Sequence, residues 1–186
     1  MDSRLKYFLI LFFPCILFAE GPLFQYKDPK TQLEFQNVYK DLRSLSVAKP
    51  NFLVTNSAGA SNVTGDGTTY TVLWPTEVYD MAGSFTSNVF TAPKSGKYLL
   101  SANVSMEGIL AAHNHIELRI VTSNRTYEKH NHISAAIPDY GMNVVTIADM
   151  EAGDTAYVAI FVDGSTKVVD ITADATNNFF SGCLIN

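Results

Sequence analysis

The stretch that decides the fold reads Phe90-Thr91-Ala92-Pro93-Lys94-Ser95-Gly96-Lys97-Tyr98-Leu99-Leu100. Pro93 and Gly96 mark a tight turn, because proline fixes φ near about −65° and glycine adopts positive φ without steric cost. After the turn, Tyr98 and every second residue to position 104 are apolar. A period of two places these side chains on one face of a strand. The stretch therefore predicts a tight turn that leads into a half-buried strand.

The rest of the chain beyond Asn51 has the same character. Short runs rich in Val, Ile, Thr, Tyr and Phe are separated by Gly, Asn, Asp and Pro, which form turns. Many short strands at such a spacing predict an all-β sandwich or barrel. The predicted strands cover residues 69–73, 84–90, 97–104, 116–121, 144–147, 155–162 and 178–185.

The stretch 90–100 resembles the core motif of the C1q-like domain of the C1q/TNF superfamily, in which an aromatic residue, a glycine and a tyrosine follow one another at fixed spacing. Three further segments agree in order with that family: Val78 to Phe85, Ala152 to Tyr157, and Asn178 to Ile185. The matching core-motif residues are Phe90, Gly96, Tyr98, Gly153, Asp154, Phe180 and Gly182.

This resemblance covers about residues 52–186. It implies a ten-stranded antiparallel jelly-roll β-sandwich that associates as a homotrimer. Members of the family with a collagen stalk carry a Gly-X-Y tract, and this sequence contains none. The resemblance therefore assigns residues 51–186 to a C1q-like jelly-roll domain without a collagen stalk.

The N-terminal segment has the layout of a secretory signal peptide over residues 1–19. Arg4 and Lys6 precede an apolar run from Tyr7 to Phe18, and Ala19 offers a small residue for cleavage. The run is shorter than the roughly 20 residues of a membrane-spanning helix. We therefore expect a secreted, extracellular protein with no membrane association after cleavage, or a cell-surface protein if the segment is retained.

Residues 20–50 read as a linker followed by a short helix. A capping-box pattern runs from Thr31 to Glu34, and Lys49-Pro50 ends the helical pattern. Two interpretations remain open, a helix that lies on the domain and a short coiled-coil neck of a dimer or trimer. Both rest on an apolar seam with spacings of 3, 4 and 3, formed by Phe35, Val38, Leu42 and Leu45.

Composition and charge exclude several functions. Only 17% of the residues are charged and the net charge is −5, whereas soluble domains average about 25% charged residues. An acidic chain without basic clusters argues against a nucleic-acid partner. Removal of the signal segment leaves Cys183 as the sole cysteine, so the mature chain forms no intramolecular disulfide.

The segment Ala156–Val162 is apolar on both faces of its predicted strand. Its even-numbered residues form one apolar face, and Tyr157, Ala159 and Phe161 form the other. A strand that is apolar on both faces is covered on both sides. In a two-sheet sandwich a neighbouring subunit can supply the second cover. The resemblance implies a homotrimer, so Tyr157, Ala159 and Phe161 are candidate trimer-interface residues.

Four histidines form two His-x-His pairs, and they are candidate ligands for zinc or another transition metal. A two-residue hairpin turn at Ser123-Asn124 places them on one polar face of two paired strands, with Glu117 between them. That register also pairs opposite charges across the strands. A polar sheet face without metal and a pH-sensitive interface are the alternatives. The four candidate ligands are His113, His115, His130 and His132.

Asp170 and Asp174, in the Asp/Asn-rich region before the last strand, are candidate calcium ligands. Calcium prefers several oxygen ligands, and ordinary turn chemistry is the alternative interpretation. Calcium and zinc are therefore the candidate cofactors.

Catalytic motifs are absent from the sequence, and Cys183 stands in an apolar strand typical of a buried structural thiol. We therefore expect a non-enzymatic homotrimer that recognises an extracellular or cell-surface protein or glycan through its loops. The alternative is a trimeric structural protein of a virion or cell surface with no separate ligand.

Overall fold

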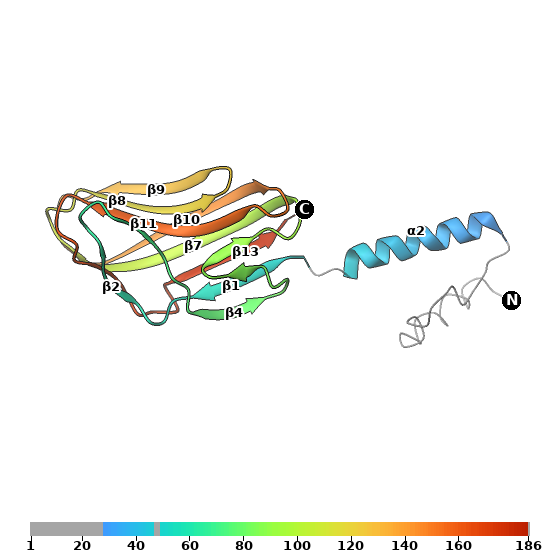
Figure 1. Ribbon diagram of the computed structural model, residues 1–186, viewed down its shortest axis with the longest axis horizontal. Helices are drawn as coiled ribbons and strands as arrows, with labels where there is room; N and C mark the ends of the chain where they lie inside the picture. The colour runs from blue at the N-terminus through green and yellow to red at the C-terminus, as the bar shows by residue number, and fades with distance from the viewer. Residues whose placement is uncertain (1–27, 47–48, 186) are drawn as a thin grey trace. The chain divides into compact units, whose positions relative to one another are not determined.

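The computed structural model describes residues 28–46 and 49–185 (Figure 1). The predicted signal segment lies outside these residues. The chain divides into two units, residues 1–47 and residues 48–186, which are described separately. Within the described ranges, no helix combines the length and apolar character needed to cross a membrane.

The first unit contains helix α2, Pro29–Ser46. The carboxylate of Asp28 caps its N-terminus by accepting the backbone N–H of Lys30 at 3.3 Å and of Thr31 at 3.2 Å. Pro29 occupies the first helical position, which has no use for an N–H group. The helix therefore begins before the capping box that starts at Thr31. Along its length Leu33 and Val38 are 62% and 55% exposed.

The second unit is a sandwich of two antiparallel sheets (Figure 1). Sheet A has the strand order β2-β12-β7-β13-β1-β4, and β10 pairs with β7. Its strands are β1 Asn51–Thr55, β2 Ala60–Thr64, β4 Thr76–Asp80, β7 Gly96–Ile109, β10 Ile137–Met150, β12 Val169–Ile171 and β13 Phe179–Leu184.

Sheet B has the order β5-β6-β11-β8-β9, and β3 pairs with β11. Its strands are β3 Thr69–Thr71, β5 Phe85–Thr86, β6 Val89–Thr91, β8 His115–Thr122, β9 Thr126–His132 and β11 Thr155–Asp163.

The all-β, two-sheet antiparallel architecture is confirmed. The described residues contain thirteen strand segments rather than ten. The excess comes from short ribbons, since β3, β5, β6 and β12 have only two or three residues each. Such short segments pair at the margins of the longer strands.

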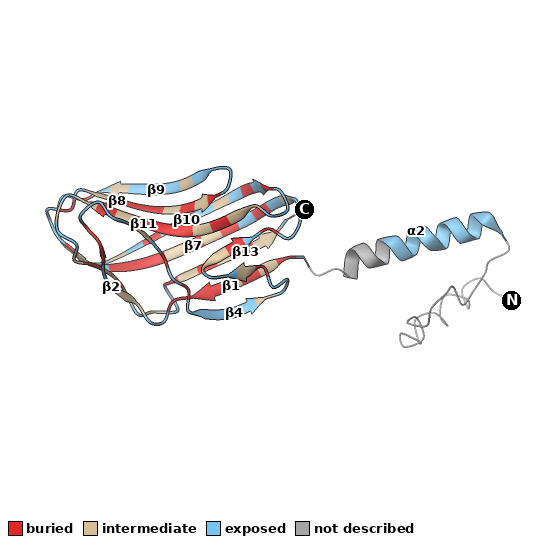
Figure 2. Cartoon of the chain, viewed as in Figure 1, coloured by how far each residue is buried: buried red, intermediate tan, exposed pale blue. Residues whose placement is uncertain are grey.

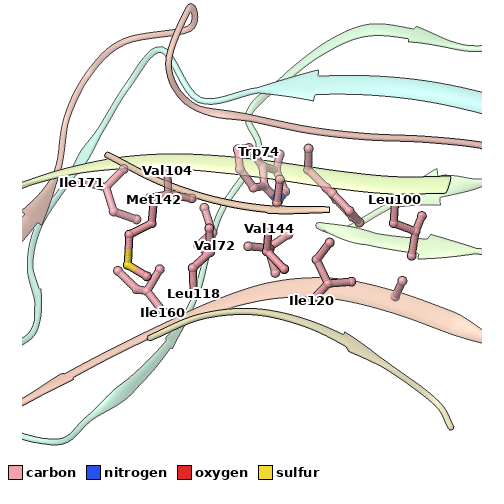
Figure 3. Close-up of a cluster of buried hydrophobic side chains, with 14 of the residues drawn as sticks. Val72, Trp74, Leu100, Val104, Leu118, Ile120, Met142, Val144, Ile160 and Ile171 are labelled. Carbon is pink, nitrogen blue, oxygen red and sulfur yellow. The ribbon is translucent and has the colours of Figure 1, made fainter. Parts of the chain in front are cut away.

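The core lies between the two sheets and follows the period-two pattern of the strands. The inner residues of β7, β8 and β11 are buried, whereas most of β4 and β9 is exposed (Figure 2). Leu118 and Ile120 of sheet B face Leu100 and Val104 of sheet A in the close-up (Figure 3). Trp74 is also part of this cluster and is 5% exposed.

The decisive stretch 90–100 forms the predicted turn between two core aromatic residues. Phe90 and Tyr98 are 1% and 0% exposed, and their rings lie 5.3 Å apart. The Tyr98 hydroxyl donates to the carbonyl of Lys94 at 2.8 Å, which closes the turn. Gly96 has a φ of 154°, within the range that favours glycine.

The other predicted motif residues meet this turn or the core beside it. Gly153 donates to the carbonyl of Ala92, and Ala92 donates to the carbonyl of Asp154, both at 2.8 Å. Phe180 of β13 packs edge-on against Phe52 at 5.0 Å. The motif residues therefore act together in the fold, although they are distant in the sequence.

Candidate functional site

The polar outer face of sheet B is built on the hairpin of β8 and β9. Thr122 donates its backbone N–H to the carbonyl of Arg125 at 2.8 Å, which closes the predicted two-residue turn. The predicted register is confirmed, with His115 opposite His132, Glu117 opposite His130 and Arg119 opposite Glu128. This register gathers three histidines at the end of the hairpin far from its turn.

The rings of these three histidines form one cluster. The ring centres of His115 and His132 lie 5.4 Å apart and are stacked. The ring of His130 is 5.9 Å from that of His115 and 6.2 Å from that of His132. His130 and His132 are exposed, and His115 is half-buried. The cluster is therefore open to solvent on one side and supported by the sheet on the other.

Charged side chains lie next to the cluster on the same face. Glu117, only 7% exposed, lies 3.0 Å from Nε2 of His115 and forms an ion pair with Arg119. Arg119 also approaches Glu128 at 3.6 Å. Its guanidinium lies over the ring of Phe161, 5.3 Å from the ring centre. The polar network therefore extends from β9 across β8 to β11.

His113 does not join this face, so the prediction of four clustered histidines is wrong for this residue. It is fully buried in the loop between β7 and β8. Its Nδ1 accepts the backbone N–H of Leu110 at 3.0 Å, and its Nε2 lies 3.2 Å from the carbonyl oxygen of Thr166. Strand β8 begins only at His115, so strand alternation does not apply to His113.

As the side chains lie, no group of three His, Cys, Asp or Glu side chains among the described residues is placed to hold a metal ion. Asp170 accepts the backbone N–H of Asn62 at 2.5 Å. Asp174 accepts the backbone N–H of Thr176 at 2.8 Å. This bond contributes most to a lowering of the pKa of Asp174. Both carboxylates thus accept backbone N–H groups, Asp170 from the distant β2 and Asp174 from its own turn. The calcium site stays a prediction.

The outer face of β11 is covered in part by its own chain. Ala159 is 1% exposed, and the rings of His115 and Phe161 lie 5.8 Å apart at a steep angle. Together with the Arg119 guanidinium over Phe161, these contacts shield much of the outer apolar face of β11 from solvent. The interface at Tyr157, Ala159 and Phe161 stays a prediction, although the pattern alone no longer demands a neighbouring subunit.

An apolar surface lies instead on the outer face of sheet A. Val145 and Ile147 of β10 are 56% and 57% exposed, and Leu99 and Tyr79 are 38% and 43% exposed. Strand pairing joins them across the sheet, since Ile147 is opposite Leu99 and Leu99 is opposite Cys183. We call this surface the sheet A strip, which consists of Leu53, Tyr79, Leu99, Val145, Ile147 and Cys183.

The sheet A strip was missed by the sequence reasoning, although a signal was present. The segment 144–148 carries apolar residues on both faces, as β11 does, with Val144 and Ala148 on one face and Val145 and Ile147 on the other. Cys183 is half-buried rather than fully buried and lines a surface pocket within the strip. Ser101, Ser181 and Gly182 also line that pocket.

Comparison with solved structures finds this architecture in proteins of low sequence identity. The globular domain of zebrafish complement 1qA protein is 18% identical, with a TM-score of 0.53, over 74% of this chain and 98% of that one. Murine APRIL at pH 5.0 is 11% identical, with a TM-score of 0.54, over 74% of this chain and 99% of that one. The chain has a C1q/TNF-like fold.

The resemblance drawn from the motif at residues 90–100 is thereby confirmed at the level of the fold. No protein-family model and no curated protein matches the sequence. The sandwich of this chain carries two surface features described above, the histidine cluster on sheet B and the sheet A strip.

Proposed function

We propose that this protein is an exported, homotrimeric recognition module that binds an extracellular or cell-surface protein or glycan through its loops. The observation that carries the proposal is the sheet A strip on a C1q/TNF-like sandwich. It offers a contiguous apolar surface for self-association, and it leaves the loops at the ends of the sandwich free for a ligand.

The composition of the strip suits contact with further copies of this chain. Its middle contains apolar side chains with Ser101 and Ser181 between them. One end carries the charged pair Lys97 and Asp149, which are opposite each other on β7 and β10. An apolar centre with a polar rim is typical of protein–protein interfaces. Burial of the strip between subunits would also explain the low charge content of the domain.

Helix α2 offers a second surface for self-association. Val38 belongs to the predicted apolar seam and Leu33 lies next to it, and both are well exposed. An isolated short helix is marginal in water, and packing of an apolar face supplies most of its stability. Association of three such helices would bury these side chains, so the coiled-coil neck is the interpretation we adopt for residues 29–46.

The candidate ligand surface lies where three loops meet at one end of the sandwich. Ser165 donates its backbone N–H to the carbonyl of Gly65 at 3.1 Å. The buried ring of His113 joins the β7–β8 loop to Thr166. A rigid scaffold that presents exposed loop residues is the usual setting of a binding site. Three copies of this surface in a trimer would convert weak contacts into avidity.

Light scattering on the chain without residues 1–19 tests the assembly. We expect a mass three times that of the monomer, independent of concentration in the micromolar range. A stable monomer would contradict the proposal, because the sheet A strip and the side chains of Leu33 and Val38 would then stay exposed.

A binding screen of the trimer on glycans and on cell surfaces tests recognition. We expect binding that Lys167→Glu in the β11–β12 loop reduces and that Lys94→Glu in the β6–β7 turn leaves unchanged. Both lysines are exposed, and they lie in different loops. Binding only to assembly partners of its own particle or surface would favour the structural alternative.

A further inference from the structure

The histidine cluster contains free ring nitrogens that point to a ligand. Nδ1 of His132 lies 3.2 Å from the backbone carbonyl oxygen of Asn114, so it is the nitrogen that donates. Nε2 of His115 is held by Glu117 at 3.0 Å. These contacts leave Nε2 of His132 and Nδ1 of His115 for another partner, and both nitrogens of His130 are available in the described part of the chain.

Two of the histidines are held on the side away from their free nitrogens, as metal-binding histidines are. A metal-binding histidine usually donates its other ring N–H to a carboxylate or a backbone carbonyl, which fixes the tautomer and the ring orientation. Glu117 supplies the carboxylate for His115, and Asn114 supplies the carbonyl for His132. Glu117 is itself fixed by its ion pair with Arg119.

The spacing of the three rings is close to the spacing of three imidazoles around one bound zinc ion. With zinc–nitrogen distances of about 2.0 Å, three imidazoles on a tetrahedral ion have ring centres about 5 Å apart. The three ring centres here are 5.4, 5.9 and 6.2 Å apart. The ring nitrogens do not yet converge on one point, but the side chain of His130 is exposed and turns toward the other two rings without displacing core atoms.

The surrounding charges favour a cation. Asp163 of β11 is opposite His115 in the sheet, and its Oδ1 atom is buried without a hydrogen-bond partner in the described part of the chain. Glu117 and Glu128 add two more carboxylates on this face, and Arg119 is the cation that pairs with both. A divalent ion would offset the excess negative charge.

We propose that His115, His130 and His132 bind one divalent transition-metal ion of the zinc class on the outer face of sheet B. Glu117 and the carbonyl of Asn114 orient two of the ligands. Three protein ligands leave a fourth position open to water. Because His115 belongs to β8 and the other two histidines belong to β9, the ion would also tie the end strand of the sheet to its neighbour.

Titration calorimetry with ZnCl2 on the untagged chain tests the site, with equilibrium dialysis as a second readout. We expect one zinc ion per chain. His132→Ala and His130→Ala should each weaken binding at least about tenfold, and Glu117→Gln should also weaken it by about tenfold or more. Lys129→Ala is the matched control, because Lys129 is adjacent to His130 but is opposite Leu118 in the register.

Circular dichroism and thermal melting establish that each variant is folded. The exposed His130 and His132 variants keep the test decisive, since neither side chain contributes to the core. The absence of zinc binding by the folded chain overturns the proposal. Zinc binding that persists in a folded variant lacking both His130 and His132 also overturns it.

Discussion

Gly182 occupies a point in the core where no side chain fits. A Cβ atom at this position would lie 2.6 Å from Cε1 of Phe52 and 2.8 Å from Cδ2 of Leu100. Its φ lies outside the left-handed region, so the backbone does not require glycine. The requirement is for space, because the ring of Phe52 packs against Phe90 at 4.7 Å and against Phe180 at 5.0 Å. Gly182 thus allows the aromatic core to close.

We expect Gly182→Ala to lower the free energy of unfolding by about 1–3 kcal/mol, the usual cost of overpacking a core. Urea denaturation measures this change. Gly141→Ala is the control, because a Cβ atom at position 141 has no neighbour within 4 Å. Its effect should stay within about 0.5 kcal/mol. Equal stability of the two variants would show that Phe52 moves without cost.

The difference between His113 and the other histidines marks a limit of reasoning from sequence. The register of β8 and β9 was predictable, because a two-residue turn fixes every pair beyond it. That rule ends where the strand ends, and nothing in the sequence shows that β8 begins at His115. The buried position of His113 depends on Thr166, which is distant in the sequence. Tertiary contacts of this kind leave no local pattern.

At the scale of a single element, the start of helix α2 follows from residues next to it in the sequence. Helix α2 starts in a common way, with Asp28 as the capping residue and Pro29 as the first helical residue. The Asp-Pro pair that marks this start is visible in the sequence. The sequence reasoning placed the start at Thr31, since that capping box also satisfies a local rule. Two valid signals competed within a few residues, and the acidic cap with proline prevailed.

The ionised form of Asp28 should stabilise α2. Its bond with the Thr31 side chain, followed by those with the backbone of Lys30 and Thr31, lowers its pKa from 3.8. A lowered pKa means that this stabilisation is present above about pH 4 and is lost as the pH falls through the pKa of the folded state. Helicity measured at 222 nm should therefore fall less between pH 6 and pH 2.5 in Asp28→Ser than in the natural chain.

Asp28→Ala should reduce helicity at every pH, because alanine offers no acceptor to the first turn. Serine retains a cap without a titrating charge, so the two variants separate capping from ionisation. Identical pH profiles for the natural chain and Asp28→Ser would contradict the role assigned to the carboxylate.

At the scale of the whole molecule, the exposed side chains of Leu99, Val145 and Ile147 gather on the outer face of sheet A. The two-sheet sandwich was predictable, since alternating strands and turn residues carry that information along the chain. The sequence did not show which sheet has the apolar outer face, because β10 and β11 both carry apolar residues on two sides. The structure distinguishes them: Arg119 and His115 cover Phe161, whereas Val145 and Ile147 stay exposed.

Two substitutions that each introduce a negative charge test which face of the sandwich forms the trimer interface. Ile147→Glu places a carboxylate in the sheet A strip, and Tyr157→Glu places one on the outer face of β11. We expect Ile147→Glu to convert the trimer to a monomer, because an unpaired charge buried in an apolar interface is strongly unfavourable. Tyr157→Glu should remain trimeric. Light scattering gives the mass of each, and circular dichroism establishes that both are folded. The reverse result would assign the interface to Tyr157, Ala159 and Phe161.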